Sequence, residues 1–348
     1  MICKKLSISI STLAVLAAAP LHAAVAFNLI SDPETPQYAI DGFNAAASLW
    51  SSRLADNITV NIEIGYSSLG ANIIGETSTT GGEVSYSLVK QALAANRSSA
   101  DDFSSYAALP SGASYTRLIN HTSDDPGGPN SGTLYLDTMD RVGMTSANAK
   151  ALGLLAPNTY LDAVIRFSSD FTFDFNHNHV APGKIDFVGA AAHEIGHALG
   201  FVSGVDDIDF YQGTAPGGTF SSNLLDLYRY SALSHTLGAG VTDYSDDSRD
   251  KFFSVDGGLT STALFSDGTN YGDGWQASHW KDNLGIGLMD PTASYGETIN
   301  ISATDLRAFD VLGYTLTPVP EPGNVLGLCG LLVGAMFLRI RRGANTLV

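Results

Sequence analysis

The segment Asp186–Gly200 reads DFVGAAAHEIGHALG and decides how the whole chain is interpreted. Its small and apolar residues predict a helix with an aspartate cap at the start and a glycine at the end. His193 and His197 are four residues apart, so their imidazoles leave one face of the helix a turn apart and can bind one metal ion. Glu194 lies at the flank of this face, where a carboxylate can take a proton from a metal-activated water.

Two histidines do not complete a catalytic metal site, which commonly has three protein ligands and one open position. Cysteine is not available for the third place, because Cys3 and Cys329 both lie in terminal segments. Four side chains of suitable chemistry follow the helix, namely Asp206, Asp207, His235 and His279. Residue type alone leaves these four open, although the polar segment around His235 is typical of a solvated histidine.

Several motifs around and after the helix resemble the leishmanolysin branch of the metzincin zinc proteases. They are His-Glu-x-x-His-x-x-Gly-Phe from His193 to Phe201, the pair His279-Trp280, and Leu288-Met289-Asp290-Pro291 before a helix at 303–312. The similarity extends over about 185–314. It implies that His279 is the third zinc ligand and that Met289 forms a turn beneath the metal, with Glu194 as general base.

The resemblance also implies the fold. We expect an α+β, metzincin-like zinc protease fold, in which a mixed twisted sheet carries the active-site helix and a C-terminal subdomain carries the third histidine and the methionine turn. Two departures are visible. Ser203 stands ten residues after the first histidine, where short-spaced metzincins have their third ligand, and the cysteine framework of the eukaryotic branch is absent. A bacterial relative without disulfides is therefore expected.

The charge balance excludes some partners. The chain has 348 residues, with 18 Lys and Arg against 35 Asp and Glu, and its formal net charge is −17. A phosphate-binding surface must present Lys and Arg, so we expect no nucleic-acid partner and no docking on anionic lipid through a basic patch. Acidity of this size is compatible with a soluble exported protein and with attraction of Ca²⁺.

Both ends are typical of export signals. Lys4-Lys5, an apolar run and a small-residue zone predict a secretory signal peptide over 1–26 rather than a membrane anchor. Val319-Pro320-Glu321-Pro322, an apolar stretch and three arginines resemble a PEP-CTERM sorting tail over 318–348, with a plain tail anchor as the alternative. The resemblance implies an exosortase-type partner, membrane contact only through the tail, and a place at the cell surface or extracellular matrix of a Gram-negative bacterium.

The body between these ends is divided into an N-terminal catalytic subdomain at 27–200 and a C-terminal subdomain at 201–317. Hydrophobic periodicity predicts helices at 38–54 and 88–95, strands at 60–64 and 163–167, and an extended segment at 171–175. The region 98–130 is rich in Ser, Asp, Gly and Pro, and we expect it to be mostly loop.

Three weaker signals remain. Asp174, Asn176 and Asn178 alternate like the first ligands of a Ca²⁺ loop, but the required Gly and the final Glu are missing, so a polar turn is the default. His177 and His179 flank the same turn and are expected at the surface, although they could line the cleft. Tyr295 follows the methionine turn at a spacing that favours packing over catalysis.

These observations predict an exported zinc endopeptidase acting on protein or peptide substrates. The alternative is a non-catalytic matrix or adhesion protein that keeps a structural or idle metal site.

Overall fold

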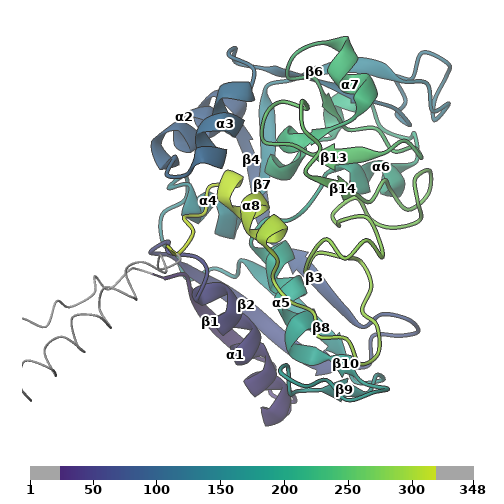
Figure 1. Ribbon diagram of the computed structural model, residues 1–348. Helices are drawn as coiled ribbons and strands as arrows, with labels where there is room; N and C mark the ends of the chain where they lie inside the picture. Colours follow the sequence, from purple (N-terminus) through teal and green to yellow (C-terminus); the bar gives the residue numbers. More distant parts are fainter. Residues whose placement is uncertain (1–23, 319–348) are drawn as a thin grey trace, which may run out of the picture.

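The computed structural model describes residues 24–318, so nearly all of the predicted signal peptide and sorting tail lies outside the described residues. Helices and several small sheets are mixed along the chain, which agrees with the expected α+β class (Figure 1). Among the described residues, no helix is both long and apolar enough to cross a membrane.

The largest sheet has four strands in the order β1-β2-β8-β3. The first three run parallel, and β3 is antiparallel to β8 with Thr77 opposite Ile165. Strands β2 and β8 form where hydrophobic periodicity predicted them, whereas the sequence analysis did not find β3. The bounds are β1 Ala26–Ser31, β2 Thr59–Ser67, β3 Gly75–Thr79 and β8 Ala163–Ser168.

Two long helices pack side by side against this sheet, α1 (Gln37–Ser51) and α5 (Phe187–Ala198) (Figure 1). The indole Nε1–H of Trp50 in α1 donates to the carbonyl of Ala192 in α5 at 2.8 Å. An aromatic cluster around Phe43 and Phe187 fills the space between helices and sheet. This packing fixes α5, which carries the predicted metal ligands.

The region 98–130 is mostly loop, as expected, but it also contains a helix and a strand that the sequence analysis did not predict. Helix α3 (Ala100–Ala108) begins with a capping box, in which Ser99 and Asp102 bond each other's backbone N–H groups. Strand β5 (Tyr115–Ile119) pairs with β6 (Tyr135–Met139) and is mostly buried. Composition misled here because Ser and Asp favour helix caps as strongly as they favour turns.

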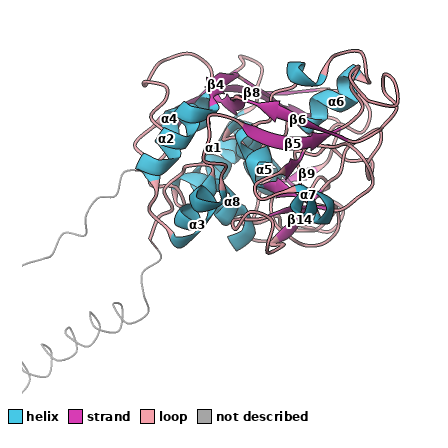
Figure 2. Cartoon of the chain, turned by 90° about the horizontal axis from the view of Figure 1, so that it is seen from above, coloured by secondary structure: helices cyan, strands magenta, loops and turns pink. Residues whose placement is uncertain are grey.

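The remaining elements that precede α5 contain between two and eleven residues. Helices α2, α3 and α8 (Ala303–Val311) gather on one side of the molecule (Figure 2). The bounds are β4 Gly81–Ser85, α2 Tyr86–Asn96, β6 Tyr135–Met139, β7 Arg141–Thr145, α4 Ser146–Ala151, β9 Phe173–Asp174 and β10 Ile185–Asp186.

The residues after α5 form short elements joined by long loops. Strand β12 pairs with β5, and α8 packs on α3, so this part of the chain is built onto the earlier part. The bounds are α6 Val205–Tyr211, 3-10 helices Gly217–Thr219 and Leu224–Tyr228, β11 Arg229–Tyr230, α7 Ala232–Leu237, β12 Thr242–Asp243, β13 Lys251–Phe253, β14 Ala263–Phe265 and α8 Ala303–Val311.

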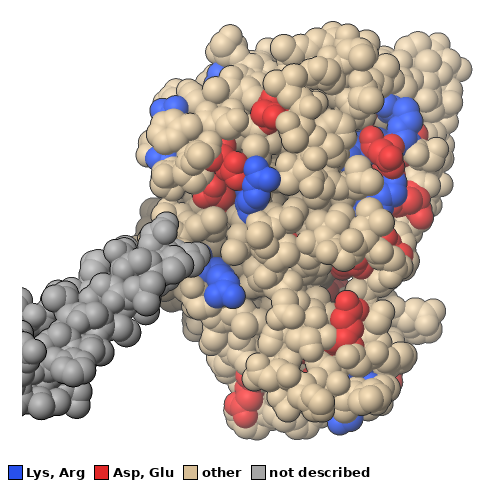
Figure 3. Space-filling model, in the orientation of Figure 1, with Lys and Arg blue, Asp and Glu red and all other residues tan. Residues whose placement is uncertain are grey.

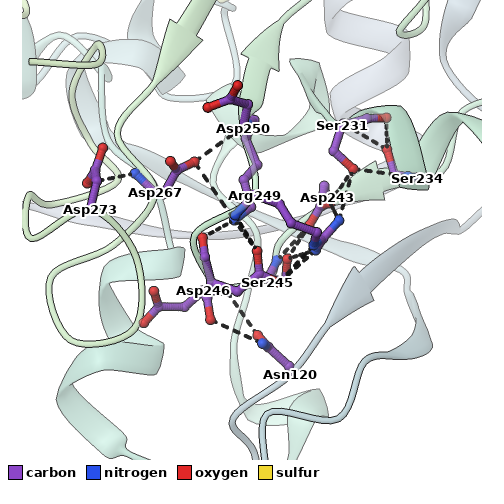
Figure 4. A network of polar contacts seen from close by, with 12 residues as sticks. Asn120, Ser231, Ser234, Asp243, Ser245, Asp246, Arg249, Asp250, Asp267 and Asp273 are labelled. Carbon is purple, nitrogen blue, oxygen red and sulfur yellow. Dashed lines mark hydrogen bonds and ion pairs between the residues drawn. The ribbon is translucent and has the colours of Figure 1, made fainter.

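A large hydrophobic core continues from Val25 to Tyr314, and a second small cluster lies under α6. Buried polar networks hold the loops beyond it. In one of them, the Arg249 guanidinium contacts Asp243 at 3.0 Å, and Ser231 donates to the same carboxylate (Figure 4). On the face drawn in Figure 3, a hollow crosses the middle of the molecule with acidic side chains on both sides of it.

Candidate metal centre

The structure brings three imidazoles together. The Nε2 atoms of His193 and His197 are 3.0 Å apart, and each is 3.2 Å from Nε2 of His279. Among the described residues these three form the one group of at least three His, Cys, Asp or Glu side chains that could hold a metal ion. The prediction that His279 joins the two helix histidines is confirmed, although 82 residues separate it from His197.

The opposite ring nitrogens show that this arrangement suits a cation. The Nδ1 atoms of His193, His197 and His279 lie 2.8, 2.7 and 3.2 Å from the backbone carbonyls of Leu288, Phe201 and Gln276. A carbonyl can only accept, so each Nδ1 carries the hydrogen and each Nε2 presents a lone pair to the other two.

Three lone pairs at this separation repel unless a cation lies among them. A tetrahedral zinc ion with nitrogen ligands at about 2.0–2.1 Å spaces those ligands about 3.3 Å apart, close to what is found. Three imidazoles also suit copper, iron and nickel, so the ligand set defines a transition-metal site without naming its ion.

The state of the rings at neutral pH also favours metal binding. Burial, together with a smaller contribution from the neighbouring His193, lowers the pKa of His197 to about 3. Burial likewise lowers the pKa of His279 well below its ordinary range. Neutral imidazoles are the form that ligates metals, so the rings of His197 and His279 require no deprotonation near pH 7.

Glu194 lies beside the three histidines in the same cleft, which has a volume of about 650 Å³. Thr77 of β3 donates its hydroxyl to Oε2 of Glu194 at 2.5 Å. Burial raises the pKa of the Glu194 carboxyl, and the hydrogen bond from Thr77 opposes that shift. Thr77 was missed by the sequence analysis, because β3 carries little hydrophobic alternation.

Met289 is completely buried and packs against α5 at Gly196, which has no side chain. A Cβ atom added to Gly196 would lie 2.5 Å from the sulfur of Met289. The adjacent Leu288 supplies the carbonyl that receives the Nδ1–H of His193. Met289 therefore packs against α5 next to His197, and its role beneath a metal ion stays a prediction.

Asp305, at the start of α8, organises the chain on both sides of this turn. Its carboxylate accepts the indole N–H of Trp280 at 2.8 Å and the backbone N–H groups of Leu288 at 2.7 Å and Ser302 at 2.7 Å. The spacing Ser302-x-x-Asp305 could have predicted a helix cap. Nothing in the sequence connects that cap to Trp280 or Leu288.

Asp206, one of the other candidate third ligands, holds the histidine loop instead. Its carboxylate accepts the backbone N–H of Ala277 at 2.6 Å and the hydroxyl of Ser278, immediately before His279. Burial raises its pKa to about 7. Asp207 and the exposed His235 lie outside the histidine cluster.

Ser203, at the position of the short-spaced third ligand, donates to Asp226 at 2.6 Å. The predicted cap by Asp186 was wrong in its chemistry. Asp186 is at the start of α5, but its carboxylate makes no capping hydrogen bond there. It accepts the ring N–H of His177 at 2.7 Å and the backbone N–H of Ile299 at 3.1 Å.

The weaker candidates take structural or exposed positions. Asp174 accepts the backbone N–H groups of Asn176 and Ala181, which is the default polar turn. His179 and Tyr295 are exposed. Ca²⁺ binding by Asp174, Asn176 and Asn178 stays a prediction.

Fold and site together define an α+β protein with a three-histidine metal-binding centre in an open cleft. Comparisons with protein-family models, with curated proteins and with solved structures find no match. The functional argument therefore depends on the chemistry of this centre.

Proposed function

We propose that the protein is an exported, zinc-dependent endopeptidase of the metzincin type, similar to the leishmanolysin branch. The observation that carries the proposal is the convergence of the His193, His197 and His279 Nε2 atoms beside Glu194. Three protein ligands and an adjacent acid, in an open cleft, are what metal-assisted hydrolysis requires.

The roles of the residues follow from their positions. When bound, zinc would polarise a peptide carbonyl and make a water more acidic. Glu194 accepts the proton from that water and later returns it to the leaving nitrogen. Thr77 holds the carboxylate in place through its hydroxyl. The peptide bond is cleaved by addition of one water, so atoms balance without a further reactant.

The position of strand β3 supports the proposal that the substrate is a polypeptide. It is the edge of the largest sheet, and within the described residues it pairs on one side only, with β8. Residues 72–77 also line the cleft. An extended peptide can add to such an edge through main-chain hydrogen bonds, which brings its backbone past Glu194.

A casein digestion with and without a chelator tests the proposal. Wild-type protein should cleave casein, and chelation should stop cleavage until Zn²⁺ is returned. Glu194→Gln should keep bound metal but lose nearly all cleavage, and His279→Ala should lose metal as well. His235→Ala is the matched control, because that exposed histidine lies outside the cluster. Chelator-sensitive cleavage retained in Glu194→Gln would contradict the role of the base.

The alternative is a matrix or adhesion protein with a structural or idle site. Structural zinc sites are usually closed by four protein ligands, and this cluster has three beside a cleft. A structural zinc site also has no need of a general base such as Glu194. Metal-replete protein that never cleaves casein would favour this alternative.

A further inference from the structure

A second cavity opens beside the metal-binding cleft. It has a volume of about 330 Å³, and Thr79 and Val202 line both cavities, so the two are adjacent. Strands β4 and β7 form one wall, and the residues around Asp207 and Ser221 form the other. We call this cavity the polar pocket.

The polar pocket is acidic. Its lining contains two carboxylates, Glu83 and Asp207, and no Lys or Arg. Glu83 is already satisfied, because Arg141 donates to one oxygen at 2.7 Å and Ser221 donates to the other. In contrast, Asp207 is exposed at the wall of the pocket, and none of the described residues donates a hydrogen bond to its carboxylate. A carboxylate with no partner in the protein is free to form an ion pair with a cationic group of a ligand.

The distance between Glu194 and the polar pocket can be estimated by counting residues along the chain from Thr77. Thr77 contacts Glu194, and Gly81 and Gly82 in the polar pocket follow four and five residues later. A strand advances about 3.3 Å per residue, so the pocket lies roughly 13–17 Å along the substrate path. A peptide that extends along β3 therefore reaches it about four residues from the bond that is cleaved.

We propose that the polar pocket binds a Lys or Arg side chain of the substrate, with Asp207 as the residue that determines this specificity. The basic residue lies about four positions to the amino-terminal side of the cleaved bond. This side follows if the substrate pairs antiparallel to β3, the slightly more stable arrangement, because the pocket lies past the C-terminal end of that strand. The proposal rests on the proposed peptidase function and goes beyond it in naming the substrate class.

The experiment uses a peptide that the protein cleaves in casein, synthesised with Lys or norleucine at the third, fourth or fifth position before the cleaved bond. We expect kcat/KM to be about two- to fivefold higher for Lys at one of these positions, as for an ion pair with an exposed carboxylate. Added salt should reduce the ratio. Asp207→Asn should bring it close to one.

Two further variants keep the test decisive. A Cβ atom at Gly82 would meet nothing within 4 Å, so Gly82→Val should fold, reduce the space in the polar pocket and lower the Lys preference. Glu34→Gln removes the same charge from an exposed loop next to β1, at the opposite edge of the sheet, and should keep the preference.

The outcomes separate the two proposals. If metal-replete protein cleaves no peptide, the peptidase function fails. If it cleaves peptides with no preference for Lys over norleucine, or with a preference that survives both Asp207→Asn and Gly82→Val, the polar pocket does not have this role. A Lys preference confined to the carboxyl-terminal side of the cleaved bond would overturn the proposed orientation.

Discussion

Replacing Asp305 by Asn should weaken metal binding at a centre that Asp305 does not touch. Its carboxylate is completely buried and accepts N–H groups from Trp280, Leu288 and Ser302. Leu288 in turn supplies the carbonyl that orients His193. Asn keeps one acceptor oxygen but replaces the other with an NH₂ group, which faces the N–H donors of Leu288 and Ser302.

The structure sets the size of the effect. Two buried donors lose their acceptor, and each costs about 1–2 kcal/mol, so Asp305→Asn should lower the free energy of unfolding by roughly 2–4 kcal/mol. In a domain of this size that corresponds to a fall in Tm of about 4–8 °C. Removing a residue that hydrogen-bonds a metal ligand typically weakens metal affinity about 10- to 100-fold. Asp305 acts on His193 only through Leu288, so we expect a loss of affinity near tenfold.

Thermal denaturation with and without Zn²⁺, together with competition against a chelator of known affinity, measures both effects. Asp310→Asn is the matched control, because Asp310 is a buried aspartate of the same helix whose side chain accepts the hydroxyl of Ser99. It should leave metal affinity unchanged. Equal metal affinity in wild type and Asp305→Asn would refute the argument that Asp305 orients His193 through Leu288.

Three other predictions follow from single contacts. Gly196→Ala places a Cβ atom 2.5 Å from the sulfur of Met289, so it should lower stability by about 1–3 kcal/mol, measured by denaturant unfolding; unchanged stability would mean that Met289 moves freely. Burial raises the pKa of Asp56 from 3.8 to about 6, so the stability it contributes is complete below pH 4 and is lost as the pH rises through 6. Asp56→Asn should remove about 1–2 kcal/mol of this dependence, checked by unfolding at pH 4 and pH 7. Stripping the metal should lower Tm, with recovery on adding Zn²⁺, since three buried lone pairs then face each other; the same Tm with and without metal would contradict the fit of the site.

The sequence predicts the centre well because its chemistry requires few residue types. His193, Glu194 and His197 follow from helix periodicity, which fixes their relative positions within one turn. His279 is different. Residue type and spacing alone left Asp206, Asp207 and His235 open, and the choice depended on a family resemblance. The hydrogen bonds that place its loop come from Asp206 and Asp305, in two helices far apart in the sequence.

The unpredicted parts of the fold have a common physical reason. Strand β3 has little hydrophobic alternation, so it has no pattern to detect, yet it supplies Thr77 to the site. Its position is set by pairing with β8, a tertiary contact. Helix α3 and strand β5 lie in a Ser- and Asp-rich region, where caps and turns use the same residues. Local composition therefore missed the helix and the strand that packing forms within a segment that is otherwise loop.

The strong acidity of the chain has a structural use in the long loops after α5. Buried carboxylates there accept backbone N–H groups that no regular helix or strand satisfies. Asp226 accepts those of Gly204 and Asn223, and Asp209 accepts those of Thr269 and Asn270. The described residues contain no cysteine, so no disulfide can fix these loops. Buried, hydrogen-bonded aspartates take over that role, and Asp206 and Asp305 apply it on either side of the third histidine.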